Sequence, residues 1–552
     1  MKQVLGCFLL MGLSFGILKA QNKQWVFFKD KGPETQVWLS NPSSFLSSKA
    51  ISRRINHGVT VNVGDVPVSA TYLEALQAGG IRVTGKSKWL NAAVVESSLT
   101  LAEIQAICPA VTGMQPVRSM TTAKQVGEMS SAQNRSSKHT AGGTFDYGAA
   151  FDQIDMMNLP CLHDKGYTGS GVLLAQFDSG FQDVDVISAF DSLRQAGRLV
   201  SYYDFVNQDS GVFDEDWHGL AVLSTIAGYL PTVYVGTAPF VSVALARTET
   251  VNSETHQEES NWLMAAEWAD SMGADIIQSS LGYYQFDQGE VDYSYADMNG
   301  NTTIISKAAD WAASRGILVC NSAGNEGGSA WRYIISPCDG DSVLCVGSVD
   351  LSGVVSGFSS VGPSSDFQVK PDVVAMGSST SLVAFGGQVM NFSGTSFSSP
   401  QIAGMVACLM EAHPLRSNMD IIEAVRKSAD RFGSPDSLYG YGLPDACRAD
   451  SLLSILDAVD DMADELQAFE SFIQVHPNPS NGQFQVEVPT HQRIKAVKIQ
   501  IVGMDGSVIM AQPVESGNTL HQMKCEKLSA GTYILEIVLS GGQSATKKIV
   551  IR

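Results

Sequence analysis

The stretch NFSGTSFSSPQIAGMVACLMEAHP, residues 391–414, combines two different patterns. From Ile402 onward, apolar residues recur at helical spacing, which predicts a buried helix. The residues just before it include Gly394, Thr395, three serines and Pro400. A helix cap needs one Ser or Thr, and proline suits a first turn. Capping therefore leaves Ser396 unexplained.

The start of a helix is a suitable place for a serine nucleophile. Free backbone N–H groups and the helix dipole both favour a negative charge there, and a serine that attacks a carbonyl creates such a charge, an oxyanion. Small neighbouring residues would let a substrate approach Ser396, and Pro400 would fix the first turn of the helix. Such a serine also needs a base, and the base needs an orienting carboxylate.

His218 and Asp178 are the candidates for the base and the carboxylate. His218 lies in Asp-Trp-His-Gly, directly before a helical pattern at 218–229, and the neighbouring glycine would leave its imidazole accessible. Asp178 follows an apolar strand predicted at 171–177, and open parallel sheets place their sites at the carboxyl ends of strands. On its own, each motif also fits a solvated loop or a turn.

A fourth candidate is Asn325, in ValCysAsnSerAlaGlyAsnGluGly at 319–327, again after an apolar strand. Its side-chain amide could donate to an oxyanion beside the backbone N–H of Ser396. Asn and Gly are common turn residues, so a plain loop is the alternative.

In chain order, these motifs resemble those of the subtilases, the subtilisin-like serine proteases. The resemblance covers about 165–447, and Gly-Thr-Ser396-x-Ser-x-Pro is its most specific part. It implies that Ser396 is the nucleophile and His218 the general base and acid. It also implies that Asp178 orients the histidine and that Asn325 is the oxyanion donor.

The resemblance extends to a substrate-binding segment, with departures elsewhere. Ser280-Leu281-Gly282 resembles the segment that pairs with the substrate backbone, which implies that Ser280, Leu281 and Gly282 bind substrate. Gln176 and Phe177 replace the aliphatic residues common before the aspartate. These departures alter packing near the base and remove no reacting group.

The region from about 145 to 455 predicts the fold class. Short apolar strands alternate with helices there, which indicates a parallel sheet covered on both faces. The predicted strands are at 171–177, 241–246, 275–278, 316–320 and 342–347, and the helices at 218–229, 260–272, 303–315 and 397–412. We expect a subtilisin-like three-layer α/β sandwich with a mainly parallel sheet. A small α+β unit precedes it at 21–117, and a β-sandwich follows at 472–552.

The flanking segments predict export. Residues 1–20 carry Lys2 and an apolar run too short to span a bilayer, which predicts a secretory signal. By resemblance, 21–117 is a subtilase propeptide that acts as chaperone and inhibitor, and the polar linker at 118–144 contains the activation cleavage. Residues 456–471 form an acidic connector. The tail resembles a type IX secretion sorting domain, and a substrate- or surface-binding sandwich is the alternative.

Composition limits the partners and cofactors. The net charge of −20 argues against nucleic acid or an anionic membrane as the main partner. The nine cysteines show no C-x-x-C spacing, which argues against zinc, and no cofactor is expected for the chemistry. We expect Cys320, Cys345 and Cys408 to be buried, and no disulfide pairing is assigned. Asp297, Asn299 and Asn301 could hold a structural Ca²⁺, although they also fit a polar turn.

The sequence therefore predicts a secreted or cell-surface serine endopeptidase, made as a proenzyme and exported through the periplasm. Its expected partners are protein or peptide substrates, its own propeptide and the outer-membrane secretion machinery. Two alternatives stay open. One is an inactive binding protein on the subtilase fold, and the other is an esterase or peptide ligase that uses the same triad.

Overall fold

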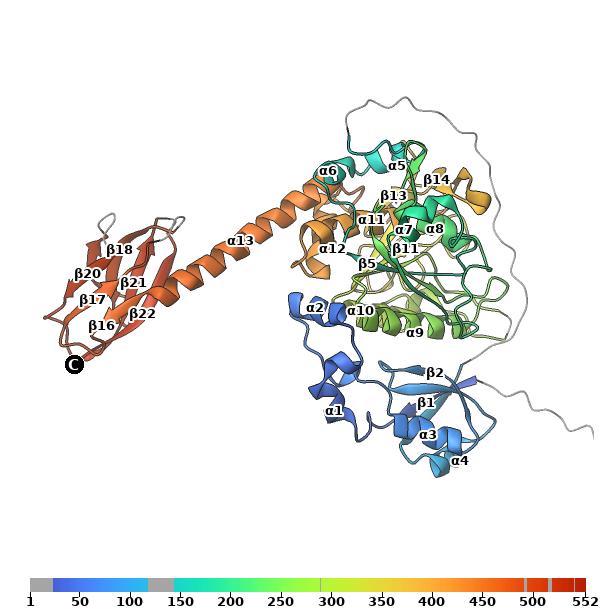
Figure 1. Ribbon diagram of the computed structural model, residues 1–552, viewed down its shortest axis with the longest axis horizontal. Coiled ribbons are helices and arrows are strands. Elements are labelled where there is room, and N and C mark those ends of the chain that lie inside the picture. The colour runs from blue at the N-terminus through green and yellow to red at the C-terminus, as the bar shows by residue number, and fades with distance from the viewer. Residues whose placement is uncertain (1–22, 118–142, 288, 491–493, 515–518, 541) are drawn as a thin grey trace, which may run out of the picture. The chain divides into compact units, whose positions relative to one another are not determined.

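The computed structural model describes residues 23–117, 143–287, 289–490, 494–514, 519–540 and 542–552 (Figure 1). The chain divides into two compact units, Met1–Leu453 and Ser454–Arg552. The predicted signal at 1–20 and nearly all of the predicted linker at 118–144 lie outside the described residues.

Seven parallel strands form the central sheet of the first unit, in the order β13-β12-β11-β10-β5-β9-β6. Their bounds are β5 Leu173–Asp178, β6 Leu199–Asp204, β9 Ser242–Arg247, β10 Ile276–Ser279, β11 Leu318–Ser322, β12 Val343–Val349 and β13 Val373–Met376. All five predicted strands are present. The two edge strands β6 and β13 were missed, because β6 is partly exposed and lacks a continuous apolar run, while β13 has only four residues.

Helices cover both faces of this sheet (Figure 1). Helices α8 (His218–Ala227) and α11 (Thr395–Ala412) pack on one face, against side chains such as Leu174 and Leu245. Helices α9 (His256–Met272) and α10 (Ile304–Ala313) pack on the other face, against Leu173 and Ala175. Neighbouring residues of one strand point to opposite faces, so both layers share each strand. The predicted three-layer α/β fold is confirmed.

Short elements and two disulfides complete this layered unit. Its other α-helices are α5 Phe151–Asp155, α6 Pro160–Asp164, α7 Asp191–Gln195 and α12 Asn418–Ser428. Its other strands are β7 Tyr229–Leu230, β8 Tyr234–Val235, β14 Thr380–Val383 and β15 Val389–Phe392. Short 3₁₀ helices lie at 188–190, 295–297 and 385–387, and another at 63–65 belongs to the N-terminal part.

Cys161 is bonded to Cys447, and Cys338 to Cys345. Cys320 and Cys408 are buried free thiols, as predicted. The expectation for Cys345 was incomplete, because this buried residue is disulfide-bonded.

The N-terminal part of the first unit is an α+β structure. An antiparallel sheet in the order β2-β3-β1-β4 carries four α-helices and a further 3₁₀ turn at 42–44. The bounds are β1 Lys23–Phe28, β2 Arg82–Ser87, β3 Ala92–Glu96, β4 Val111–Pro116, α1 Thr35–Ser40, α2 Ser48–Asn56, α3 Ala70–Ala78 and α4 Leu101–Ile107. One face of the sheet packs on α3 and α4, and the other contributes Trp25, Val94 and Val117 to the core formed with α9 and α10.

A buried group of charges fixes this N-terminal part to the end of α9. Asp270 is fully buried and forms ion pairs with Arg53 Nη2 at 2.6 Å, Arg54 Nη1 at 2.8 Å and Lys88 Nζ at 2.7 Å. Arg53 also donates to the backbone carbonyls of Ala274 and Arg315. These cations lie at the C-terminal end of α9, where the helix dipole favours positive charge.

We expect Arg53→Ala to lower the free energy of unfolding of the precursor by about 3–5 kcal/mol, because it removes one partner from a buried ion-pair group. Denaturant unfolding of a full-length chain that also carries Ser396→Ala measures this without self-cleavage. Arg82→Ala is the matched control. The Arg82 side chain is 73% exposed and, within the part of the chain that the structure describes, pairs only with Glu96, so its removal should cost less than about 1 kcal/mol. Equal effects of the two variants would contradict the anchoring role of Arg53.

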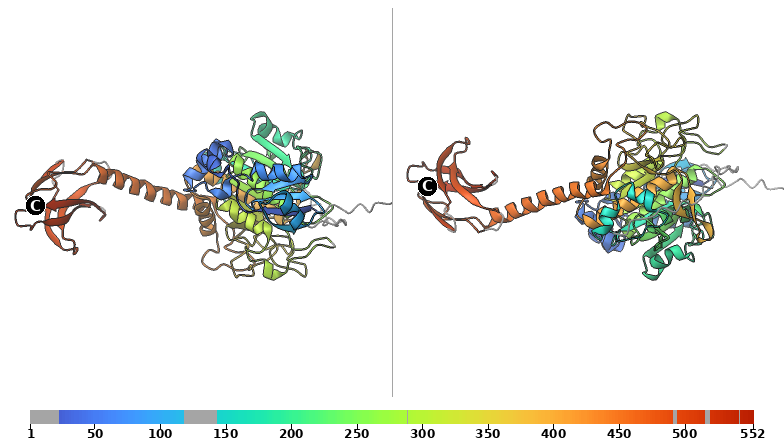
Figure 2. Two further views of the ribbon diagram at one scale, coloured as in Figure 1. Left: turned by 90° about the horizontal axis from the view of Figure 1, so that it is seen from below. Right: turned by 90° about the horizontal axis from the view of Figure 1, so that it is seen from above.

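The second unit is an antiparallel β-sandwich, as predicted. Its sheets have the orders β16-β17-β20 and β19-β18-β21-β22 and face each other (Figure 2). Residues of both sheets share one core. The strands are β16 Gln474–His476, β17 Gln483–Glu487, β18 Ala496–Val502, β19 Val508–Pro513, β20 Leu520–Lys524, β21 Gly531–Leu539 and β22 Ser544–Ile551. The acidic connector belongs to one helix, α13 (Ala446–Phe472). Among the described residues, none of the helices is long and apolar enough to cross a membrane.

Candidate active site

Asp178 and His218 meet at the carboxyl edge of the central sheet. Asp178 is the last residue of β5, and His218 is the first residue of α8. The His218 Nδ1 atom lies 2.7 Å from Asp178 Oδ1. Asp178 is fully buried, whereas the His218 side chain is 26% exposed. The carboxylate is therefore shielded, while the imidazole remains accessible.

Two glycines allow this approach of β5 and α8. A Cβ atom on Gly219 would lie 2.2 Å from the carbonyl oxygen of Gly180, and one on Gly180 would lie 2.5 Å from the backbone nitrogen of Asp216. Real Cβ contacts are never so short. The glycine after His218 thus permits close backbone packing, which is a stronger reason than the accessibility inferred from sequence.

Hydrogen bonds and nearby charges act on the Asp178–His218 pair and shift the pKa of His218. Asp178 Oδ1 also accepts from the backbone N–H of Ser179 at 2.9 Å. Burial lowers the pKa of His218, but the Asp178 carboxylate and the nearby Asp216 together raise this pKa above its usual value. Carboxylates beside an imidazole stabilise its protonated form, so the pair is arranged to receive a proton.

Ser396 lies in the first turn of α11, and Pro400 one turn later. The expectation that Pro400 occupies the first turn is therefore wrong. Proline has no N–H, so it cannot bond to the carbonyl four residues earlier, that of Ser396. The hydroxyl of Ser280 donates to this Ser396 carbonyl instead, at 3.0 Å. Ser280 thereby supports the backbone that carries Ser396.

The start of α11 lies beside His218. The rings of His218 and Phe397, the residue after Ser396, have centroids 5.8 Å apart. Among the described residues, no hydrogen bond joins His218 to Ser396. Catalytic hydrogen bonds often tighten only when substrate is bound, so this geometry is compatible with a serine–histidine pair.

Asn325 lies in the loop after β11 and contacts the start of α11. Its Oδ1 accepts from the backbone N–H of Thr395 at 2.9 Å and from the Thr395 hydroxyl at 3.0 Å. These bonds fix the oxygen end of the amide, so Nδ2 remains as a donor. The residue itself is exposed. These hydrogen bonds place Asn325 beside Thr395, the residue before Ser396, and no signal in the sequence indicated them.

The segment Ser280-Leu281-Gly282 follows β10 at the same edge of the sheet. Ser280 is buried, while Leu281 and Gly282 are half-buried. The carbonyl of Leu281 accepts from Asn321 Nδ2 at 2.9 Å, and a Cβ on Gly282 would lie 2.5 Å from Ile335. The contacts with Asn321 and Ile335 therefore fix the backbone of this segment.

Sequence reasoning missed an acidic group near this segment. One carboxylate oxygen from each of Glu249, Glu254 and Glu258 lies within 4.8 Å of the others. Burial and neighbouring carboxylates raise the pKa of Glu249 to about 8 and that of Glu258 to about 10. Carboxylate oxygens are ligands that suit Ca²⁺. Here, however, Glu258 accepts hydrogen bonds from two backbone N–H groups and Glu249 accepts one from the Tyr283 hydroxyl, so both carboxylates already have partners within the protein.

The residues proposed from sequence for calcium make bonds within their own turn. Asp297 accepts from the backbone N–H and hydroxyl of Ser294, and the Asn299 side chain bonds to Ala296 and Thr302. Asn299 Oδ1 also accepts the backbone N–H of Asn301. A structural Ca²⁺ at this turn stays a prediction.

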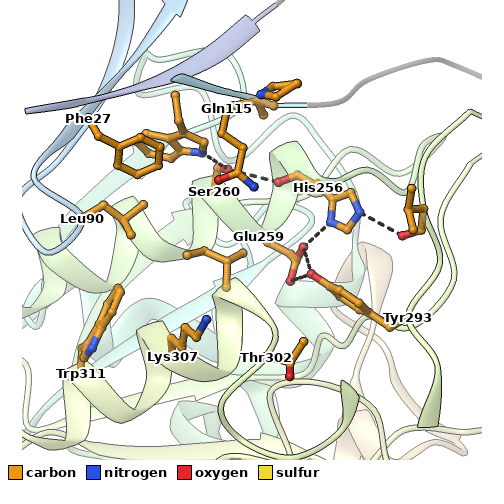
Figure 3. Close-up of a pocket in the computed structure, with 15 residues that line it drawn as sticks. Phe27, Leu90, Gln115, His256, Glu259, Ser260, Tyr293, Thr302, Lys307 and Trp311 are labelled. Carbon is orange, nitrogen blue, oxygen red and sulfur yellow. Dashed lines mark hydrogen bonds and ion pairs between the residues drawn. The ribbon is translucent and has the colours of Figure 1, made fainter. Parts of the chain in front are cut away.

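A cavity of about 760 Å³ lies between the N-terminal part and helices α9 and α10. Figure 3 shows Phe27, Leu90 and Gln115 on one side and Glu259 and Trp311 on the other. In its wall, Trp25 Nε1 donates to the Ser260 hydroxyl at 3.2 Å. None of the predicted site residues lines this cavity, so it belongs to the N-terminal contact.

A parallel sheet between two helix layers, with Asp178, His218 and Ser396 at one edge, defines the class of subtilisin-like α/β proteins. The family model described as "Subtilase family" matches residues 169–442. Subtilisin NAT of Bacillus subtilis subsp. natto is 31% identical over 294 residues, covering 52% of this chain and 68% of its own length. Subtilisin of Bacillus pumilus is 31% identical over 294 residues, covering 52% of this chain and 94% of its own. The chain belongs to the subtilase family.

Both flanking parts also match known domains. The family "Peptidase S8 propeptide domain, Bacteroidota" matches residues 23–139, and "Secretion system C-terminal sorting domain" matches residues 474–552. The protein is thus a subtilase with a propeptide and a type IX sorting domain, which marks it for secretion or the cell surface. A crystal structure of MycP1 with the N-terminal propeptide removed aligns with 54% of this chain and 96% of that chain, at 23% identity and a TM-score of 0.43.

Proposed function

We propose that this protein is a serine endopeptidase that hydrolyses peptide bonds through Ser396, His218 and Asp178. The observation that carries the proposal is the 2.7 Å contact between Asp178 and His218, at the sheet edge beside the start of α11. A serine there has a base, an orienting carboxylate and its own backbone N–H at the helix start within one site. No metal or cofactor has a step in this reaction.

The proposed reaction has two stages. His218 takes the hydroxyl proton of Ser396 as the serine oxygen attacks the scissile carbonyl, and Asp178 stabilises the imidazolium that forms. The oxyanion accepts hydrogen bonds from the Ser396 backbone N–H and from Asn325 Nδ2. His218 then protonates the leaving amine, which leaves an acyl-enzyme. Water, activated by His218, hydrolyses this ester and releases Ser396.

Substrate binding is proposed for the segment after β10. The backbone of Leu281 and Gly282 would lie along an extended substrate. The Ser280 hydroxyl would hold the backbone of Ser396 in place through its hydrogen bond to the Ser396 carbonyl. An extended peptide gains affinity from main-chain hydrogen bonds to such a segment.

A serine-directed phosphonate probe tests the proposed function. We expect the secreted protein to be labelled at Ser396, as mapped by peptide mass spectrometry, and labelling to be lost in His218→Ala. No labelling, or labelling at another serine, would favour the inactive binding protein. Ester hydrolysis or peptide ligation without peptide hydrolysis would favour the esterase or ligase.

Maturation between Arg118 and Thr144 is part of the proposal, although most of this segment lies outside the described residues. Since residues 23–117 pack against α9 and α10, their release requires a cut beyond Val117. We expect the N-terminus of the active secreted enzyme, read by Edman sequencing, to fall between Arg118 and Thr144. An active form that begins at Gln21 would make residues 21–117 a permanent domain.

A further inference from the structure

Gln176 is a buried polar residue in the inner strand β5 of the sheet. It is fully buried in β5, two residues before Asp178, so both side chains point to the same face. Its register partner on β9 is the fully buried Leu245, and its partner on β10 is Gln278. The sequence showed Gln176 only as a departure from an aliphatic position.

The side-chain amide of Gln176 joins Asp178 to the helix that carries His218. Its Nε2 atom donates to the backbone carbonyl of Gly219 at 3.0 Å and approaches Asp178 Oδ2 at 3.4 Å. Both contacted atoms are acceptors, so the amide must present its NH₂ group to them. Asp178 Oδ1 is already engaged by His218 and Ser179. Gln176 therefore contacts the other carboxylate oxygen.

The opposite end of the same amide has no partner. Gln176 Oε1 is buried and accepts no hydrogen bond among the described residues. A buried carbonyl without a partner costs stability, and each such group in a native protein requires an explanation. An aliphatic side chain would fill this position without that cost. The two contacts made by Nε2 supply the explanation.

We propose that Gln176 is a positioning residue of the triad, holding the Asp178 carboxylate and the first turn of α8 in one fixed arrangement. The inference rests on the proposed peptidase function. With Oδ2 held by Gln176, the carboxylate cannot rotate its Oδ1 atom away from His218 Nδ1. With the Gly219 carbonyl held as well, the first turn of α8 cannot shift along β5. Gln176 touches no substrate and acts only through Asp178 and His218.

The test compares Gln176→Met with Leu245→Met in the mature enzyme. Methionine is close in size to both residues and lacks a donor, and a Leu-to-Met change in a core is usually tolerated. Leu245 lies beside Gln176 in the same row of the sheet, is fully buried and belongs to the apolar core. It therefore controls for packing.

For Gln176→Met, we expect kcat to fall about tenfold with KM within twofold, because the reacting groups lose their fixed geometry. The acid limb of the kcat/KM profile should also move up by about half a pH unit. Without its donor, the Asp178 carboxylate is less stabilised and attracts the imidazolium proton more strongly, so the pKa of His218 rises. Activity requires neutral His218, so the limb moves to higher pH. Leu245→Met should change neither quantity.

Other charged groups near the pair stay the same in both variants. They include Glu215 and Asp216 before α8, Arg247 at the end of β9 and Glu249 two residues later. The start of α11 contributes the uncharged Thr395, Ser396 and Phe397. A shift of the acid limb seen only in Gln176→Met is therefore attributable to the lost amide.

Two results would overturn the inference. One is wild-type kcat and an unmoved acid limb in Gln176→Met. The other is an equal loss of activity and melting temperature in both variants, which would assign Gln176 to packing alone. If Gln176→Met does not fold, Gln176→Leu replaces it, with the same expectations. Failure of the proposed function is distinct, because the wild-type enzyme would then neither hydrolyse peptides nor react with the phosphonate probe.

Discussion

Ser396→Ala should abolish peptide hydrolysis and leave the fold and secretion intact. Removal of the equivalent serine in subtilisin, a relative of this chain, lowers turnover on the order of a millionfold. The substitution deletes only the hydroxyl oxygen. The Ser396 carbonyl keeps its bond to Ser280, and Pro400 keeps its place in α11. Turnover of a fluorogenic peptide, the circular dichroism spectrum and the amount of protein outside the cell measure the three expectations.

Ser398→Ala is the matched control for this change. Ser398 lies in the same helix, is fully buried, and bonds to the carbonyl of Thr395 at 3.0 Å. Because it has no proposed reacting role, its loss should change turnover only a few-fold. Activity of Ser396→Ala within tenfold of the wild type would exclude Ser396 as the nucleophile.

Asn325→Ala should lower kcat by roughly a hundred- to a thousandfold with little change in KM. This magnitude was measured for the oxyanion donor of subtilisin, so it is taken from a relative. The physical reason is that the oxyanion exists only in the transition state, and Nδ2 has no comparable charge to bind in the ground state. Steady-state kinetics on a short peptide measures both constants.

A fall in kcat in Asn325→Ala has a second possible cause. This substitution also removes the oxygen that accepts the Thr395 N–H at the start of α11. Asn325→Asp separates the two effects. Aspartate keeps an oxygen for the Thr395 N–H and lacks the NH₂ donor. We expect Asn325→Asp to be as impaired as Asn325→Ala. Near-normal turnover in Asn325→Asp would make Asn325 a helix cap and not an oxyanion donor.

The layered fold could be predicted from the sequence because most of its buried strands and helices are indicated by short, continuous stretches of residues. Apolar runs identified the buried strands, and Asp178, His218 and Asn325 each adjoin the end or beginning of such an element. In parallel sheets, these ends meet at one edge. The approximate location of the site therefore followed from the order of elements alone.

Contacts between distant residues could not be predicted in this way. Arg53 and Asp270 are 217 residues apart, and Ser280 and Ser396 are 116 apart. Neither pair can be recognised from a sequence motif or from hydrophobic periodicity, because each contact depends on how whole helices and strands pack together. The same limit applies to Gln176, whose sequence context shows an unusual residue but not its bond to Gly219.

The disulfide between Cys161 and Cys447 has a consequence for autolysis. The two cysteines are 286 residues apart and enclose all four residues proposed to react, from Asp178 to Ser396. A protease at high local concentration cuts exposed loops of its own copies. A single cut between the cysteines leaves both fragments covalently joined. Nicked enzyme should therefore migrate as one band on a non-reducing gel and as two bands after reduction, and the joined fragments can keep the core intact.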